Sequence, residues 1–461
     1  MTSQTNHSAS SEKINPMLEG DIKKTLTNMT VPMILGMIML MTFGLVDTFF
    51  ISLLGTQELA AISFTFPVTF TVISLNIGLG IGTSAVIAKL LGAKQTAKAQ
   101  LAATAAIMIV ICLVGLLSFI GINTIEPVFT LLGASPALLE PISDYMTIWY
   151  VAGVLLSVPM VGNSVLRADG DTKTPSIIMA ACGAINAALD PLLIFGYGPF
   201  IGLGIQGAAI ATAIAWAVGV VWILVLLMKR KLVIPRLLTA TEFINNISGI
   251  VKIGIPAAGA NMLTPISAGI VTAIVADYGN AAVAAWGVGG RLESIACIVM
   301  LALSMSLPPL ISQNMGANKM NRVYSAYKIA IGFVLGFQLL VFFVLYGLSG
   351  YIAQIFAKEP GVAQLITLFL MIVPFGYGLQ GVVVLTNSAF NAIHQPMSAL
   401  LLNALRLFLF FVPFCYLGSI WYGLHGIFIG AVIANLVMAA LSFYWFRRHI
   451  YQTQLHEVTS E

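Results

Sequence analysis

Two aspartates lie inside long apolar stretches of the sequence, where an ionisable side chain is costly. Asp47 falls in the apolar run at residues 28–54, and Asp190 falls in the run at 174–197. Two carboxylates that meet in a low-dielectric environment do not both ionise easily, so the pair is expected to carry a proton. With nearby amide and hydroxyl oxygens, the same pair would also form a hard-oxygen site for a monovalent cation such as Na⁺. The sequence leaves H⁺ and Na⁺ open as alternatives.

Three neutral polar residues extend this candidate cation site. Asn186 precedes Asp190 by four residues, which places both side chains on one face of a helix. Pro191 cannot donate a backbone hydrogen bond, so the helix is weakened there and has a point at which two conformations could differ. Thr212 in the next apolar run adds a hydroxyl group. Asn163 is assigned to the same site, although it joins only if its own helix extends further than its apolar run predicts.

The second half of the chain has charged residues of its own inside apolar runs. Arg291 and Glu293 are two positions apart, so they cannot share a helix face, and Arg406 has no acidic neighbour in sequence. Either the arginines bond carbonyls or carboxylates of neighbouring helices, or they line a central cleft and contact substrate. The candidate cleft residues are Arg291, Glu293, Asn387 and Arg406.

The elements that must position these residues are membrane-spanning helices. Of the 461 residues, 59% are apolar and 8% are charged, and the mean hydropathy is +0.98. This composition excludes a soluble enzyme, a nucleic-acid-binding protein and a disulfide-rich secreted domain, and the continuous apolar runs exclude a β-barrel. Since a span needs about 20 apolar residues, the runs predict an all-α integral membrane protein with 12 transmembrane helices.

Basic residues predict the orientation of these helices. Lys and Arg gather in every second loop and after the last span, at 89–98, 167–173, 229–236, 319–322 and 447–448. The positive-inside rule therefore places both termini in the cytoplasm, with the protein in the plasma (inner) membrane. The predicted organisation is an N-terminal tail (1–27), an N-lobe (28–228), a linker (229–248), a C-lobe (249–447) and a C-terminal tail (448–461).

The two predicted lobes are related by an internal duplication. Pro32 and Pro256 are 224 residues apart, and the same offset relates Asn163 to Asn387. Because each lobe has an even number of helices, both insert in the same direction, as a parallel repeat around a cleft that can open to either side. The C-lobe positions equivalent to Asp47, Asp190, Asn186 and Thr212 are Val271, Val412, Phe408 and Ala431. The duplicate is therefore expected to have an apolar lining.

No metal, cofactor or catalytic group is expected. The four cysteines lie singly in apolar runs and form no C-x-x-C pair, and the five histidines are scattered. The sequence also lacks a P-loop lysine motif, so energy for transport would come from an ion gradient or from another subunit. Since both lobes lie in one chain, a monomer is expected.

Over nearly its full length the sequence resembles the multidrug and toxic compound extrusion (MATE) family, and in particular its DinF-type branch. The resemblance rests on residues 46–48 (Val-Asp-Thr), 162–164 (Gly-Asn-Ser) and 186–191, together with the acidic first lobe. It implies export of small-molecule drugs or dyes, cationic or amphipathic, by antiport with H⁺, which is favoured, or with Na⁺. It also implies that Asp47 is the coupling group. The residues that match the family's polar network are Asn163, Asn186, Asp190 and Thr212.

Two alternatives remain at this point. A lipid-linked precursor flippase of the same superfamily often has fourteen spans and several cations in its cleft, whereas the sequence predicts twelve spans and an acidic first lobe. A membrane-embedded enzyme would need a metal or nucleophile constellation, which the sequence does not show.

Overall fold

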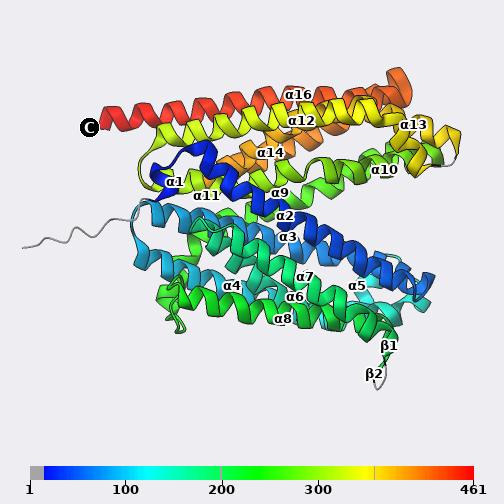
Figure 1. The fold of residues 1–461 in the computed structure, drawn as a ribbon, viewed down its shortest axis with the longest axis horizontal. Helices are drawn as coiled ribbons and strands as arrows, with labels where there is room; N and C mark the ends of the chain where they lie inside the picture. Colours follow the sequence, from blue (N-terminus) through cyan, green and yellow to red (C-terminus); the bar gives the residue numbers. More distant parts are fainter. Residues whose placement is uncertain (1–14, 198–199, 358, 461) are drawn as a thin grey trace, which may run out of the picture.

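The computed structural model describes residues 15–197, 200–357 and 359–460, and these residues are almost entirely helical (Figure 1). The predicted tail at 1–27 is described only from residue 15. Within the described ranges, 11 helical segments are long and apolar enough to cross a membrane. The last of them, Pro396–Gln454, contains two spans, because the chain leaves helical geometry and reverses at Tyr422 and Gly423. The described chain therefore forms the twelve predicted spans.

The N-lobe is a bundle of six spans. They are α2 (Ile22–Ser52), α3 (Thr56–Gly92), α4 (Thr96–Asn123), α6 (Pro136–Ala168), α7 (Lys173–Phe195) and α8 (Gly204–Lys229). The short elements are α1 (Pro16–Glu19), α5 (Ile125–Leu131) and the antiparallel pair β1 (Gly196–Tyr197) and β2 (Phe200–Ile201). Val110, Phe129 and Met146 are among the buried apolar side chains that form its core.

The C-lobe has the same six-span layout, but three of its spans are interrupted. Its elements are α9 (Ala240–Ala276), α10 (Asn280–Ala296), α11 (Ile298–Gly316), α12 (Met320–Phe356), α13 (Pro360–Ile372), η1 (Val373–Gly376), α14 (Tyr377–Ala392), α15 (Pro396–Ala404), η2 (Leu405–Phe411) and α16 (Val412–Ser460). One span breaks at Cys297, between α10 and α11. A second contains the 3₁₀ turn η1, and a third contains the π-helical segment η2.

The duplication is visible in the backbone as well as in the sequence. Gly55 and Gly279, which begin the second span of each lobe, both have positive φ (154° and 92°). Lys94 and Asn318, in the turn that follows that span, have nearly equal φ values of 58° and 57°. Residues other than glycine rarely adopt this conformation, so its recurrence at equivalent positions shows that the two lobes share one fold.

Two helices extend beyond their predicted ends. α2 begins at Ile22 rather than at 28, because Asp21 caps the helix by accepting a hydrogen bond from the backbone N–H of Lys24 (2.8 Å). α16 continues to Ser460, so the predicted C-terminal tail is helical as far as it is described. Hydropathy marks the apolar part of a span, whereas capping decides where the helix ends.

The linker between the lobes is shorter than predicted for the same reason. α9 begins at Ala240 rather than at 249, because Thr239 and Glu242 form a capping box. Arg236 donates hydrogen bonds to both oxygens of Glu242 (2.7 and 2.8 Å), and these bonds lower the pKa of Glu242 to about 2. The linker outside helices is therefore residues 230–239.

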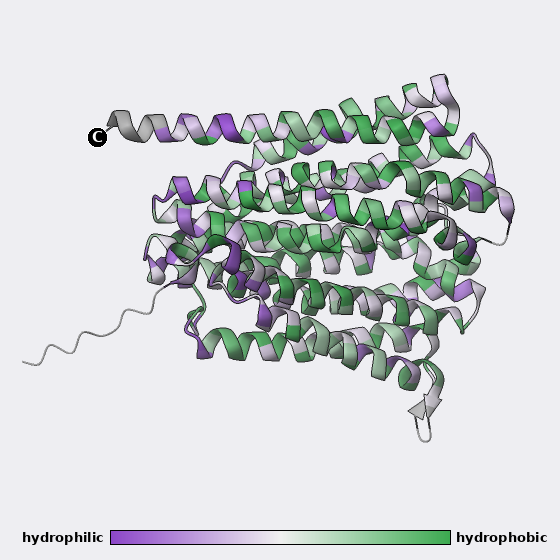
Figure 2. Ribbon diagram, turned by 45° about the horizontal axis from the view of Figure 1, so that its top comes forward, coloured by the Kyte–Doolittle hydropathy of each residue, from purple (hydrophilic) through white to green (hydrophobic). Residues whose placement is uncertain are grey.

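The lobes contact each other in the half of the molecule that carries the basic loops, here named the basic end. Hydrophilic residues gather there, on the left in Figure 2. α3 packs on α9 and α11, and α2 packs on α11. Gly92 and Gly316, which are equivalent in the repeat, lie so close to the other lobe that a Cβ at either would collide with the backbone of Gln313 or Lys89. By contrast, among the described elements α10 packs chiefly on α9 and α13 of its own lobe. The two lobes are therefore closed against each other at the basic end.

Candidate functional site

Polar side chains of α7 and α8 form one hydrogen-bonded group in the N-lobe. Asp190, which lies five residues before the end of α7, is fully buried (0% exposed). Asn186, one helical turn earlier, donates through Nδ2 to Asp190 Oδ1 at 3.2 Å and to Thr212 Oγ1 at 3.3 Å. The structure thus brings together the three residues that the sequence predicts as neighbours on these two helices.

Asp47 joins this group from α2. Its carboxyl lies within hydrogen-bonding reach of the carboxyl of Asp190. Asp47 Oδ1 and Asp190 Oδ2 are buried, and neither has a hydrogen-bond partner in the described chain. An ionised carboxylate only accepts hydrogen bonds, so two carboxyls bond each other only when one of them is protonated. The pair therefore has the geometry of a site that holds a proton.

Tyr145 on α6 is a further member of this group that the sequence analysis missed. It is 8% exposed and lies close enough to Asp47 and Asp190 to interact electrostatically with both. Its one signal in the sequence is a lone hydroxyl near the start of an apolar run. Tyrosines are common at the ends of membrane spans, so this signal did not separate Tyr145 from an ordinary interfacial tyrosine.

Asn163 lies apart from the group in this structure. It is five residues before the end of α6, near the basic end, and its Oδ1 has no hydrogen-bond partner in the described chain. At 1.5 Å per residue, it lies roughly 18 Å nearer the basic end than Asp190. The apolar run at 138–167 predicts this helix, and α6 (Pro136–Ala168) extends only slightly beyond that run. Asn163 therefore does not join the group in the described chain.

The C-lobe contains a polar cluster of its own. Glu293 on α10 lies close enough to Arg406 of η2 to interact electrostatically, and it lies near Gln380 on α14. Arg406 is 9% exposed, and its Nε has no hydrogen-bond partner in the described chain. Tyr377, which is 1% exposed, adjoins the same carboxylate. Arg406 therefore has in space the acidic neighbour that it lacks in sequence.

The helices that supply this cluster depart from α-helical geometry close to it. The break at Cys297 follows Glu293 by four residues, η1 ends directly before Tyr377, and η2 contains Arg406. Irregular turns re-aim side chains within a span, and π-helical turns are frequent at functional sites. Three interruptions thus meet at one polar cluster.

The expectation of an apolar C-lobe is correct only at the positions equivalent to the N-lobe group. Val271, which is equivalent to Asp47, is fully buried in the C-lobe core. The Glu293–Arg406 cluster occupies other positions, so the lobe as a whole is not apolar. The repeat could not predict this cluster, because it arises where the two sequences differ.

The other two candidate cleft residues lie apart from this cluster. Arg291 is exposed on α10. Asn387 is partly buried on α14, five residues before the helix end near the basic end, and its Oδ1 has no hydrogen-bond partner in the described chain. Asn387 therefore occupies the same place in the C-lobe as Asn163 in the N-lobe, and only Glu293 and Arg406 of the four candidates are brought together.

The MatE family profile matches residues 32–192 and 256–417, one match in each lobe, and the two matches start 224 residues apart. The chain belongs to the MATE family. It is 40% identical to the FAD transporter of Shewanella oneidensis over 433 residues, which cover 94% of this chain and 96% of that protein. It is 26% identical to the multidrug export protein MepA of Staphylococcus aureus, over 90% of this chain and 91% of that protein.

A solved structure of the family has the same architecture. The Vibrio cholerae MATE transporter VcmN in the bent form superimposes with a TM-score of 0.90 at 35% identity, covering 94% of this chain and 98% of that chain. This protein is therefore a multi-pass membrane transporter with the MATE fold, and multidrug exporters are among its relatives. The relatives are named for different cargo, so family membership leaves the substrate open.

Proposed function

We propose that this protein exports organic compounds across the plasma membrane in exchange for protons, by alternating access. The observation that carries the proposal is the close approach of the Asp47 and Asp190 carboxyls. Asn186 donates to Asp190 and Tyr145 lies near both aspartates, so neither neighbour supplies a positive charge that compensates the pair. The pair therefore changes its own net charge when it gains or loses a proton. Two carboxyls that approach each other closely can share one proton, which supports H⁺ as the coupling ion.

Coupling requires that the proton and the organic substrate prefer different conformations of the protein. Asp47 lies on α2, which packs on α7 of its own lobe and on α11 of the other lobe. A change in the charge of Asp47 therefore acts on a helix that contacts both lobes. In this scheme the proton binds while the cleft faces outward and the substrate leaves. The proton is released, and the next substrate binds, while the cleft faces the cytoplasm.

The orientation follows from the basic loops. The positive-inside rule places the basic end, and both termini with it, in the cytoplasm. Since the lobes are closed against each other at that end, this conformation corresponds to the outward-facing half of the cycle. Both lobes and both polar clusters lie in one chain, which supports a functional monomer within the lipid bilayer.

The first candidate substrates are cationic or amphipathic drugs and dyes. The acidic N-lobe pair and the similarity to MepA both support this class. A second candidate is a flavin dinucleotide, because the relative with 40% identity is named an FAD transporter. Arg406 supports this candidate as well, since a permanently charged guanidinium suits a phosphate group. A lipid-linked precursor flippase is disfavoured, because the described chain has twelve spans and one acidic lobe.

Reconstituted vesicles test this proposal directly. Ethidium and FAD are supplied separately, and each is tested with a pH gradient alone and with a Na⁺ gradient alone. We expect the pH gradient to drive ethidium export by the native protein and not by Asp47→Asn. Asp277→Asn, which removes an exposed carboxylate at the end of α9, is the matched control and should transport normally.

Each other outcome changes the proposal in a defined way. Transport on Na⁺ alone would overturn proton coupling. Movement of FAD but not of ethidium would replace the first substrate class by the second. Full pH-driven transport by Asp47→Asn would overturn the role of the N-lobe pair.

A further inference from the structure

The segment that precedes α2 lies across the boundary between the lobes at the basic end. Asn15 caps the short helix α1, and its side chain accepts a hydrogen bond from the Met17 N–H (3.0 Å). Figure 1 shows α1 beside α11 of the C-lobe, although the chain continues into α2 of the N-lobe. Residues 15–20, here named the N-terminal latch, therefore connect the two lobes.

Three side chains of the C-lobe hold the latch by its backbone. Asn314 donates to the carbonyl of Met17 (2.9 Å), Lys319 donates to the carbonyl of Leu18 (3.1 Å), and Arg322 donates to the carbonyl of Gly20 (2.8 Å). Arg322 also donates through Nε to Asn314 Oδ1 (3.1 Å), which orients the amide. These bonds go to three backbone carbonyls of the latch, so they depend on its backbone conformation rather than on its side chains.

Gln313 joins the latch, the N-lobe and the C-lobe at one point. Its Nε2 donates to the carbonyl of Ala168 at the end of α6 (2.8 Å), and its Oε1 accepts from Asn15 (3.1 Å). Gln313 is 2% exposed, and its backbone is the one that Gly92 of the N-lobe approaches closely. The latch thus bonds to the point where the two lobes are closest.

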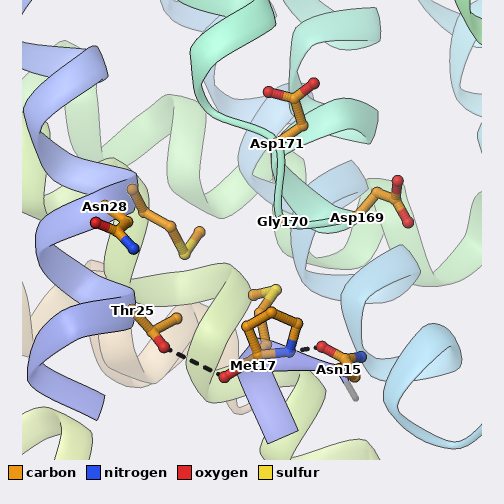
Figure 3. Close-up of a pocket in the computed structure, with 9 residues that line it drawn as sticks. Asn15, Met17, Thr25, Asn28, Asp169, Gly170 and Asp171 are labelled. Atoms are coloured by element: carbon orange, nitrogen blue, oxygen red, sulfur yellow. Dashed lines mark hydrogen bonds between the residues drawn. The ribbon is translucent and has the colours of Figure 1, made fainter. Parts of the chain in front are cut away.

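Met17 anchors the latch by apolar contact. It is 3% exposed and belongs to the apolar cluster that forms the core of the C-lobe. On its other side, Met17 and Asn15 border a cavity of about 440 Å³ that is also lined by Asn28, Asp169 and Asp171 of the N-lobe (Figure 3). The latch is therefore packed into the C-lobe core, whereas on the N-lobe side Met17 touches Gly170 beside the cavity.

The repeat provides a natural comparison for this arrangement. The linker at residues 230–239 precedes α9 just as the latch precedes α2, and it is bonded to α4 of the opposite lobe. Gln100 donates to the carbonyl of Lys231 (2.7 Å), and Thr104 accepts from the N–H of Ile234 (2.9 Å). The linker is joined covalently to both lobes, whereas the latch is attached to the C-lobe by non-covalent contacts alone. Of these two segments, only the latch can separate from the opposite lobe.

We propose that residues 15–20 are a releasable latch that holds the basic end shut, and that they must leave Asn314, Lys319 and Arg322 before the transporter opens there. Alternating access requires the two lobes to separate at the boundary that the latch spans. The latch cannot stay bonded to the C-lobe during this separation unless α1 moves away from α2. This inference concerns the gate and does not depend on which compound is carried.

Cross-linking tests whether release is required. Cysteines replace Asn15 and Gln313 in a Cys112→Ser background, since Cys112 is the exposed native cysteine among the four. A short, reducible bis-methanethiosulfonate reagent then joins them. The matched control joins cysteines at Arg236 of the linker and Glu242 in the first turn of α9, which are paired at 2.7 Å. We expect cross-linking at 15–313 to stop dye export until the reagent is reduced, and cross-linking at 236–242 to leave export unchanged.

A second measurement detects opening of the basic end without a transport assay. A cysteine at Ser306, which is fully buried and bonded to Thr30 across the lobe boundary (2.7 Å), is labelled with an impermeant maleimide from the basic side. Lys319→Ala and Arg322→Ala should each raise the labelling rate several-fold, and the 15–313 cross-link should suppress labelling.

The proposal is overturned if the cross-linked protein exports dye at the native rate, if the 15–313 pair does not cross-link, or if weakening the latch leaves labelling unchanged. Failure of the proposed transport function would leave the labelling result intact, so the two failures are distinguishable.

Discussion

The two lobes hold charge in the membrane in different ways, although they share one fold. In the N-lobe, the carboxyls of Asp47 and Asp190 lie against each other, and no basic side chain is among their described partners. In the C-lobe, Glu293 is set against the permanently charged Arg406. A pair of acids can exchange a cation, whereas an acid beside a guanidinium has a fixed compensating charge. The duplication thus gave both lobes the same fold. After the sequences diverged, the first lobe has a pair of acids that can exchange a cation, and the second has an acid with a basic side chain nearby.

The largest expected effect comes from removing the exchangeable charge. Asp47→Asn is nearly isosteric and retains a hydrogen-bonding group, but it cannot bind and release a proton. We expect gradient-driven export to fall to the level of empty vesicles, with normal insertion and yield. Glu293→Gln serves as the comparison in the other lobe and should retain pH-driven export. Equal loss in both variants would remove the functional distinction between the lobes.

The next largest effect concerns stability of the C-lobe. Arg406→Ala leaves Glu293 without its neighbouring cation, so we expect the free energy of unfolding to fall, by less than the roughly 3–5 kcal/mol typical of a directly bonded buried pair. Replacing both, as Arg406→Met with Glu293→Gln, should recover much of that loss. Denaturant unfolding in detergent measures the free energies, and the double-mutant cycle isolates the coupling. Additive effects would show that the two charges do not stabilise each other.

A smaller effect follows from one turn that differs between the lobes. His394 occupies in the C-lobe the turn that Gly170 occupies in the N-lobe, and both have positive φ (62° and 95°). His394 Nε2 lies 3.4 Å from the carbonyl of Ala85 in the opposite lobe. Burial, and then the charge of Lys89, lower the pKa of His394 from 6.5 to about 4. The closed basic end therefore binds fewer protons than an open end in which the imidazole is solvated.

Lowering the pH should consequently favour opening of the basic end. Below the ordinary pKa of 6.5 and down to about 4, each pH unit weakens closure by up to about 1.4 kcal/mol, or tenfold. Maleimide labelling of a cysteine at Ser306, divided at each pH by the rate at which the same maleimide labels a free thiol such as glutathione, should therefore increase between about pH 7.5 and pH 5.5. His394→Gly copies the N-lobe turn and should abolish the acceleration. An unchanged pH profile in that variant would assign the effect to another group.

The smallest effect is expected at the edge of the N-lobe group. Thr212→Val removes the hydroxyl that accepts from Asn186 at 3.3 Å. A neutral hydrogen bond is worth about 0.5–1.5 kcal/mol, so pH-driven export should fall by roughly two- to tenfold, and Thr212→Ser should restore it. A complete loss with Thr212→Val would show that the hydroxyl is itself part of the cation site.

The sequence predicted what depends on local composition and on the repeat. Apolar runs predicted the twelve spans, and the spacing of Asn186 and Asp190 predicted that they share one helix face, where the structure shows a hydrogen bond between them. It could not predict contacts that depend on how helices pack. Tyr145 lies near Asp47 but comes from another helix, and Glu293 and Arg406 come together from two different spans, each of which is interrupted. The latch was predicted to be part of the N-terminal tail, because a helix of four residues is too short to show a helical period of apolar residues.

Proton release on substrate binding tests the central claim most directly. Purified protein in weak buffer near neutral pH is mixed with ethidium, and the protons released per protein are measured. We predict release by the native protein and by Glu293→Gln, and no release by Asp47→Asn. Equal release by the native protein and Asp47→Asn, or loss of release in Glu293→Gln alone, would contradict the assignment of cation exchange to the N-lobe pair.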